Sequence, residues 1–161
     1  MLHSIQANLR ISALREVIWT AWTTVEGCES FFAPKSRVEL HPNGRYEQLF
    51  DLDAPQGSQG SEGCRILAVE APSMLSFTWN APPSMPDIRK QRTHVMLYLE
   101  AYGEKQTHLT LIHDGWGRNP DWQAARSYFE RVWRHVVLPR LNYYLTHGAV
   151  DWNQPNAYRE I

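Results

Sequence analysis

The feature that most constrains the fold of this chain is a long amphipathic helix predicted in its last third. It begins at Asn119-Pro120-Asp121, where Asn is a favourable N-cap, Pro suits the first helical position and Asp complements the positive helix end. The pattern continues to His147, and Gly148 is a favourable C-cap. A helix of roughly 28 residues spans about 42 Å, so it needs a long apolar surface against which to pack. Its apolar face consists of Trp122, Ala125, Phe129, Val132, Trp133, Val136, Val137 and Tyr144.

Two further features of this segment carry predictions. Arg126, Glu130 and Arg134 follow one another at i,i+4 spacing on the opposite face, where they predict a solvated, ion-paired surface. Pro139 lies inside the helix, where it removes one hydrogen bond and clashes with the carbonyl of His135. We therefore expect a kink there, which would let the helix follow a curved sheet.

The middle of the chain reads as antiparallel strands, because apolar and polar residues alternate along it. The pattern is present over 3–11, 38–50, 64–70 and 74–79, and Asn43-Gly44 is a strong hairpin signal within the second range. Between 3–11 and 38–50, helical spacing predicts two short helices, with Ser12 as the N-cap of the first.

A further hairpin between residues 94 and 113 fixes its own register. Leu97 must pair with Leu109 or Leu111 to keep the apolar side chains on one face of the sheet. A three-residue loop containing Gly103 gives that pairing. The order of elements then predicts an α+β helix-grip fold. It consists of a curved antiparallel sheet of about six or seven strands wrapped around the long C-terminal helix, with two short helices after the first strand.

Length and composition indicate one domain. We place it at residues 1–150, followed by a polar tail, 151–161, which we expect to be poorly ordered apart from Trp152, which can pack back. Sixteen basic and seventeen acidic residues give a net charge of −1, so no nucleic-acid or membrane-surface partner is indicated. No secretory signal or membrane-spanning stretch is recognisable, and Cys28 and Cys64 lack a CxxC spacing, so we expect a cytoplasmic protein.

Four motifs occur in order along the chain. They are ALREVIWTAWTTVEGCESFFAP at 13–34, HPNGRY at 41–46, VEAPSMLSFTW at 69–79 and THLTLIHDGW at 107–116. Together they resemble START-like helix-grip proteins of the SRPBCC superfamily, and most closely the subgroup related to activators of the Hsp90 chaperone ATPase. The residues that correspond in the first motif are Val17, Trp19, Ala21, Thr23, Glu26, Phe32, Ala33 and Pro34.

The resemblance implies the same fold and a cavity between sheet and helix, but one fold hosts many functions. The chain also departs from the family pattern. Phe31 replaces a tryptophan, the segment 81–92 contains three prolines, and the long helix contains Pro139. These differences affect the cavity and its mouth, so no family ligand is transferred.

The candidate ligand-binding residues are those expected to point between sheet and helix. They either line an apolar pocket with a few polar groups or fill a packed aromatic core. They are Phe77, Trp79, Leu97, Leu111, His113, Phe129, Trp133 and Val136.

His113 is the best polar candidate, because it continues the inward face at a strand end and can titrate near neutral pH. The alternative is a structural histidine bonded to the backbone. The hairpin register puts His94 and His113 on opposite faces of the sheet, so a shared metal site is not expected. The spacing of Gly57, Gly60 and Gly63 predicts a flexible loop rather than a dinucleotide site. We expect no catalytic residue, no metal and no cofactor.

Three hypotheses remain. The first is a binding protein that holds a small apolar molecule in the cavity. The second is an enzyme, of cyclase, dehydratase or hydrolase type, acting in the same cavity. The third is a protein-interaction module that regulates a chaperone. A homodimer is a further possibility, since Trp116 and Trp152 could lie at an interface.

Overall fold

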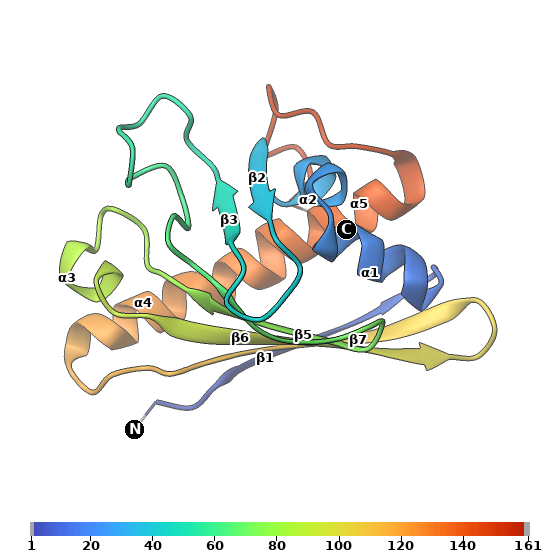
Figure 1. The fold of residues 1–161 in the computed structure, drawn as a ribbon, viewed down its shortest axis with the longest axis horizontal. Coiled ribbons are helices and arrows are strands. Elements are labelled where there is room, and N and C mark those ends of the chain that lie inside the picture. Colours follow the sequence, from blue (N-terminus) through green and yellow to red (C-terminus); the bar gives the residue numbers. More distant parts are fainter. Residues whose placement is uncertain (1, 160–161) are drawn as a thin grey trace.

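The computed structural model describes residues 2–159 and has the expected helix-grip architecture. Its main sheet is antiparallel, with five strands in the order β1-β7-β6-β5-β4, and β2 and β3 form a separate two-stranded sheet. All helices lie on one face of the main sheet (Figure 1). The strands are β1 (Ile5–Ile11), β2 (Lys35–Val38), β3 (Tyr46–Leu49), β4 (Ile66–Glu70), β5 (Met74–Trp79), β6 (Thr93–Tyr102) and β7 (Gln106–Asp114).

Two short helices, α1 (Arg15–Thr23) and α2 (Val25–Phe31), follow the first strand as predicted. The proline-rich segment 81–92 contains one helical turn, α3 (Pro86–Arg89), whose Ile88 packs into the core. The long C-terminal helix consists of α4 (Pro120–Val132), a π-helical turn η1 (Trp133–Val137) and α5 (Leu138–His147). None of these helices within residues 2–159 is long and apolar enough to cross a lipid bilayer.

The π-helical turn is how the long helix accommodates Pro139. Pro139 is the second residue of α5, immediately after the turn, and the Leu138 N–H donates to the carbonyl of Trp133, five residues back. A wider turn moves the preceding carbonyls away from the proline ring, which would clash with the carbonyl of His135 in a regular α-helix. The helix is therefore distorted next to Pro139, as the sequence predicts, and the distortion takes the form of a π-helical turn.

The β6–β7 register confirms the pairing deduced from the sequence. Leu97 pairs with Leu111 and Leu99 with Leu109, and residues 103–105 form the connecting turn. Gly103 has a φ of 67°, a left-handed conformation that favours glycine. His94 and His113 occupy adjacent pairs of the ladder and so lie on opposite faces of the sheet.

The predicted helix caps are partly wrong. The Asn119 side chain accepts from the Trp122 N–H, as expected. Ser12, in contrast, caps no helix: α1 begins later, with Leu14 as its N-cap and no side-chain cap bond. The chain bends at Ser12 after β1, and Leu14, the N-cap of α1, is 51% exposed.

The charged face that α4 and η1 share has a role that its spacing alone did not indicate. β1 is an edge strand, and its outer carbonyls need partners. Arg126 donates to the carbonyls of His3 (2.6 Å) and Ser4 (3.2 Å), and Arg134 donates to that of Gln6 (2.6 Å). Glu130 lies between the two arginines and pairs with both. These bonds fasten the helix to the edge of the sheet.

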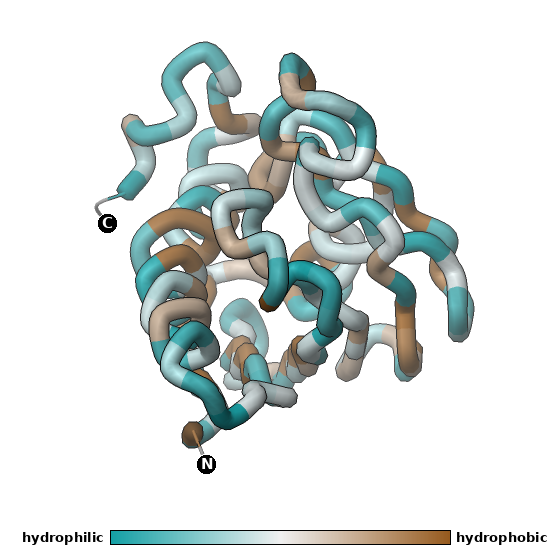
Figure 2. Tube along the Cα trace, turned by 90° about the vertical axis from the view of Figure 1, so that its left-hand side faces the viewer, coloured by the Kyte–Doolittle hydropathy of each residue, from teal (hydrophilic) through white to brown (hydrophobic). Residues whose placement is uncertain are grey.

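The segment after α5 is a packed part of the molecule over residues 151–159, which corrects the expectation of a poorly ordered tail. It is largely hydrophilic (teal in Figure 2) yet folds back on the domain. The Trp152 Nε1 donates to the carbonyl of Glu29 (2.7 Å), and the Tyr158 ring lies 4.4 Å from that of Tyr143. Trp116, one of the two tryptophans considered for a dimer interface, is buried within the domain, whereas Trp152 is half-buried.

We predict that Arg126→Ala lowers the free energy of unfolding by roughly 1–2 kcal/mol, because it removes charge-assisted bonds to the edge strand. Urea denaturation measures the change. Arg118→Ala is the matched control, since Arg118 is exposed and lies just before α4. Equal stabilities for the two variants would contradict a fastening role for Arg126.

Candidate functional site

A cavity of about 720 Å³ lies beside the long helix, bordered by helix residues between Tyr128 and Arg140 and by Trp79 at the end of β5. Its remaining walls are the segments 50–51 and 58–60, the segment 79–83 and the C-terminal segment from Trp152 to Arg159. It opens to solvent, because exposed residues such as Asp51 and His135 border it.

Three aromatic rings form the floor of the cavity. The ring of Phe32 lies 5.5 Å from that of Trp79 and 5.9 Å from that of Trp133, and the two indole rings lie 5.9 Å apart. Each ring comes from a different element, namely the end of α2, the end of β5 and η1. Rings packed at such distances stabilise one another, so the floor is a rigid apolar surface.

The eight residues selected from the sequence divide into two groups. Four of them border the cavity: Trp79, Phe129, Trp133 and Val136. The other four, Phe77, Leu97, Leu111 and His113, are completely buried and do not border it. They lie nearer the middle of the sheet, where side chains from sheet and helix fill the space between them. The sequence identified the inward face correctly but could not show how far along it the cavity lies.

His113 is held as a structural residue. The Trp133 Nε1 donates to its Nδ1 (3.0 Å), so the neutral ring carries its proton on Nε2 and donates to the Thr93 hydroxyl (2.6 Å). Burial, with a smaller contribution from His94, lowers the pKa of His113 well below its ordinary value. Both ring nitrogens are occupied and the ring stays neutral, so His113 is not available as an acid, a base or a metal ligand.

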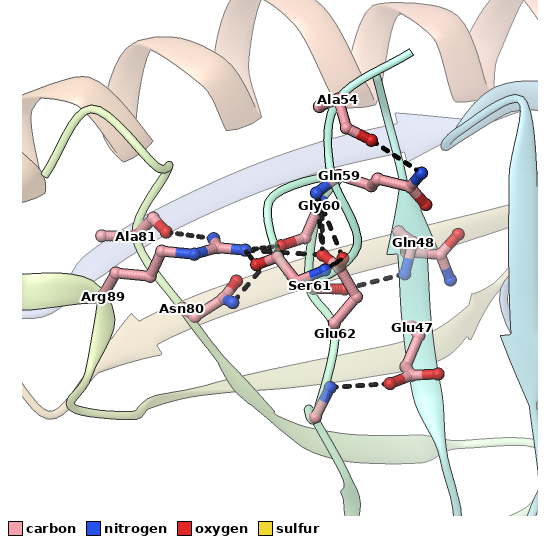
Figure 3. Close-up of polar contacts among 12 residues, drawn as sticks. Glu47, Gln48, Ala54, Gln59, Gly60, Ser61, Glu62, Asn80, Ala81 and Arg89 are labelled. Atoms are coloured by element: carbon pink, nitrogen blue, oxygen red, sulfur yellow. Dashed lines mark hydrogen bonds and ion pairs between the residues drawn. The ribbon is translucent and has the colours of Figure 1, made fainter. Parts of the chain in front are cut away.

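The glycine-containing loop after β3 is ordered by one carboxylate. Glu62 accepts hydrogen bonds from the backbone N–H groups of Gly57, Gln59 and Gly60 (Figure 3). Burial alone would raise the pKa of Glu62, but these backbone donors outweigh it and lower that pKa. Gly60 also approaches β3 so closely that a Cβ atom would collide with the carbonyl of Gln48. The sequence predicts a flexible loop here, whereas the structure shows a loop held by hydrogen bonds to Glu62.

Arg89 connects this loop to the opposite wall of the cavity. Its guanidinium donates to the carbonyls of Ala81 (2.7 Å), Gly57 (2.6 Å) and Gly60 (2.8 Å) and pairs with Glu62 (3.4 Å), as Figure 3 shows. Sequence reasoning missed both Arg89 and Glu62. The only available signal was an acid within a glycine-rich loop, a pattern typical of backbone capping but not specific to it.

Arg140 is a second arginine that the sequence did not single out. It lies in α5, borders the cavity and is only 7% exposed. Its Nε and Nη2 both donate to the carbonyl of Pro155, at 3.1 and 2.7 Å, and its guanidinium lies 5.1 Å from the ring of Trp152. The pKa of Arg140 is lowered from its ordinary value by burial and, secondarily, by the nearby positive charge of Arg159.

Other reactive groups do not assemble into a centre in residues 2–159. No cluster of His, Cys, Asp and Glu suited to a metal ion occurs there. Burial raises the pKa of Cys28 to about 12 and that of Cys64 to about 11, so both thiols stay protonated and unreactive. Asp51 and His135 both border the cavity, but among the hydrogen bonds of residues 2–159 none joins the two side chains.

Comparison with known proteins gives a family and a fold. A family model described as "Activator of Hsp90 ATPase homolog 1-like protein" matches residues 12–146. Protein MLL2253 from Mesorhizobium loti superposes with a TM-score of 0.72 at 23% identity, covering 92% of this chain and 100% of that one. No curated protein matched the chain.

Two further solved structures share the fold. CalU16 from Micromonospora echinospora has a TM-score of 0.66 at 20% identity, covering 97% of this chain and 83% of its own. The Aha1 dimer from Colwellia psychrerythraea has a TM-score of 0.65 at 19% identity, covering 91% of this chain and 98% of its own. At these identities the likeness establishes the fold alone.

We predict that Glu62→Gln destabilises the protein by roughly 1–3 kcal/mol near neutral pH, because the backbone donors of the loop lose a charged acceptor. The folded-state pKa of Glu62 lies below its ordinary value of 4.5. The stabilisation is therefore present above that value and is lost as the pH falls through the folded-state pKa. Urea denaturation across this range should show the variant and the wild type converging in acid. Glu104→Gln, in the exposed turn after β6, is the control, and a constant gap between E62Q and wild type would contradict the assignment.

His113→Phe tests the neutral structural histidine. It leaves the Trp133 indole N–H and the Thr93 hydroxyl without a buried partner, so we predict a loss of roughly 1–3 kcal/mol at about pH 8. Wild-type stability falls as the pH drops below 6.5, the ordinary pKa of histidine, because the unfolded chain takes up a proton that native His113 does not. The variant lacks this contribution, so its deficit narrows towards about pH 5.5. Equal pH dependence of the two proteins would contradict the prediction, and His3→Phe, at an exposed position, is the control.

Proposed function

This chain belongs to the family of proteins like the activator of Hsp90 ATPase homolog 1, and on that premise we propose that it binds a small apolar molecule in the cavity beside the long helix. The observation that carries the proposal is the open cavity of about 720 Å³ with a floor of three aromatic rings. Pockets for small molecules typically measure about 300–1,000 Å³, and apolar and aromatic side chains predominate in them.

The rigidity of the surroundings supports the same proposal. Here the loop between β3 and β4 is fastened by Glu62 and Arg89, and the C-terminal segment is fastened by Arg140 and Trp152. These bonds fix the loop and the C-terminal segment in positions that leave the aromatic floor of the cavity uncovered. A preformed pocket binds its ligand without the cost of ordering the protein.

An enzymatic role has less support. Acid–base chemistry needs titratable groups that converge on a bound substrate. His113, the one candidate found in the sequence, has both ring nitrogens occupied and does not border the cavity. Asp51 and His135 do border it, but each is exposed to solvent.

A chaperone-regulating role is suggested by the name of the family model alone. No surface feature of the described residues singles out a protein partner of that kind. Nor do Trp116 and Trp152, which pack within the domain, support a dimer interface, although the Colwellia relative is a dimer.

We predict that Val136→Phe weakens the binding of an uncharged apolar dye, Nile red, by about tenfold, because the larger ring occupies or strains the cavity. Val136 is half-buried at the cavity wall, so the protein should remain folded. Val17→Phe is the matched control, since Val17 is a helical valine that is 50% exposed on α1 and does not border the cavity. Fluorescence titration measures both. A wild-type protein that does not bind the dye, or equal affinities for the two variants, would refute the proposal.

A further inference from the structure

The cavity is apolar at its floor and positively charged around its walls. Four arginines border it, Arg89, Arg131, Arg140 and Arg159, whereas Asp51 is the only acid among the described residues that does so. Arg89 is neutralised by its ion pair with Glu62. The other three arginines form no ion pair within residues 2–159.

Arg140 is the residue for which this imbalance matters most. A buried guanidinium keeps its proton, so Arg140 remains a cation, and no acid among residues 2–159 forms an ion pair with it. The carbonyl of Pro155 accepts from its Nε and Nη2, while its Nη1 has no hydrogen-bond partner in the described part of the chain. A carbonyl supplies only a partial charge, and buried charges in proteins are normally paired.

Arg159 adds a second positive charge at the same end of the cavity. Its positive charge lies close enough to Arg140 to lower the pKa of that guanidinium. Two like charges repel each other, so placing them together does not by itself stabilise the folded chain. Arg131 is different: it is exposed, lies over the ring of Tyr128 and is nine residues from Arg140, or roughly 13 Å along the helix. The positive end of the cavity is therefore the end where α5 meets the C-terminal segment.

From this arrangement we infer that the ligand is an apolar carboxylic acid, with its carboxylate at Arg140 and Arg159 and its apolar body on the rings of Phe32, Trp79 and Trp133. The inference rests on the proposed function and specifies the ligand class. A carboxylate matches the planar fork of a guanidinium and compensates both arginines at once. The aromatic floor then accepts the rest of the molecule, which needs no further charge.

The test uses decanoic acid and decanol, which have the same chain length and differ in charge, each competed against bound Nile red near neutral pH. We expect the wild-type protein to bind decanoate about tenfold or more tightly than decanol, as a charge-assisted bond implies. Arg140→Gln and Arg159→Gln should each remove most of that preference while decanol still binds. Arg118→Gln, which removes an exposed arginine outside the cavity, should leave the preference intact.

Arg159 is exposed, so the Arg159→Gln variant should fold. If Arg140→Gln loses its structure or no longer binds Nile red, the preference of Arg159→Gln for decanoate over decanol tests the inference instead. Equal binding of decanoate and decanol by wild-type protein that binds Nile red would overturn the inference and leave the proposed function intact. A preference for decanoate that survives both substitutions would also overturn it. Failure of the wild-type protein to bind Nile red would instead refute the proposed function.

Discussion

The structure is governed by a mismatch of width between one helix and one sheet. Five strands spaced about 4.8 Å apart extend across roughly 19 Å, whereas a helix with its side chains is about 10–12 Å wide. The long helix, the main element packed on the sheet, therefore covers about half of its inner face. The helices α1 and α2 and the β2–β3 hairpin lie over the rest (Figure 1), and the C-terminal segment packs against α2 and α5. The cavity is the volume that these irregular pieces leave beside the helix.

Arginine side chains connect the pieces that have no regular pairing. Arg126 binds carbonyls just before β1 and Arg134 binds one of β1, Arg89 binds those of the loop after β3, and Arg140 binds that of Pro155. In each case the acceptor is a backbone carbonyl outside a complete ladder or helix, which would otherwise need water. One guanidinium has five N–H donors in a fixed plane, so a single side chain satisfies several such carbonyls. This use of arginine explains how loops and edges are held rigidly enough to leave a preformed cavity.

What the sequence predicts well is what depends on periodicity and local chemistry. The pairing of Leu97 with Leu111, the Asn119 cap and the disruption near Pro139 all follow from spacing or from one residue's stereochemistry. The contacts of Arg89 and Arg140 do not, because each joins segments far apart in the sequence through irregular backbone. Nor could the position of the cavity along the inward face be predicted. Phe77 and Trp79 share that face two residues apart, yet only Trp79 borders open space.

His113 and Arg140 show two outcomes of burying an ionisable side chain. Burial lowers the pKa of His113, so the ring gives up its proton and becomes a neutral bridge between Trp133 and Thr93. The same physical effect acts on Arg140, but a guanidinium cannot lose its proton at physiological pH, and its charge persists. A histidine can thus be part of a sealed core without any counter-charge, whereas Arg140 remains a cation at the cavity wall, held by the Pro155 carbonyl and the Trp152 ring. The carboxylate that we propose as the ligand's charged group therefore rests on an arginine, rather than a histidine, being buried at the cavity wall.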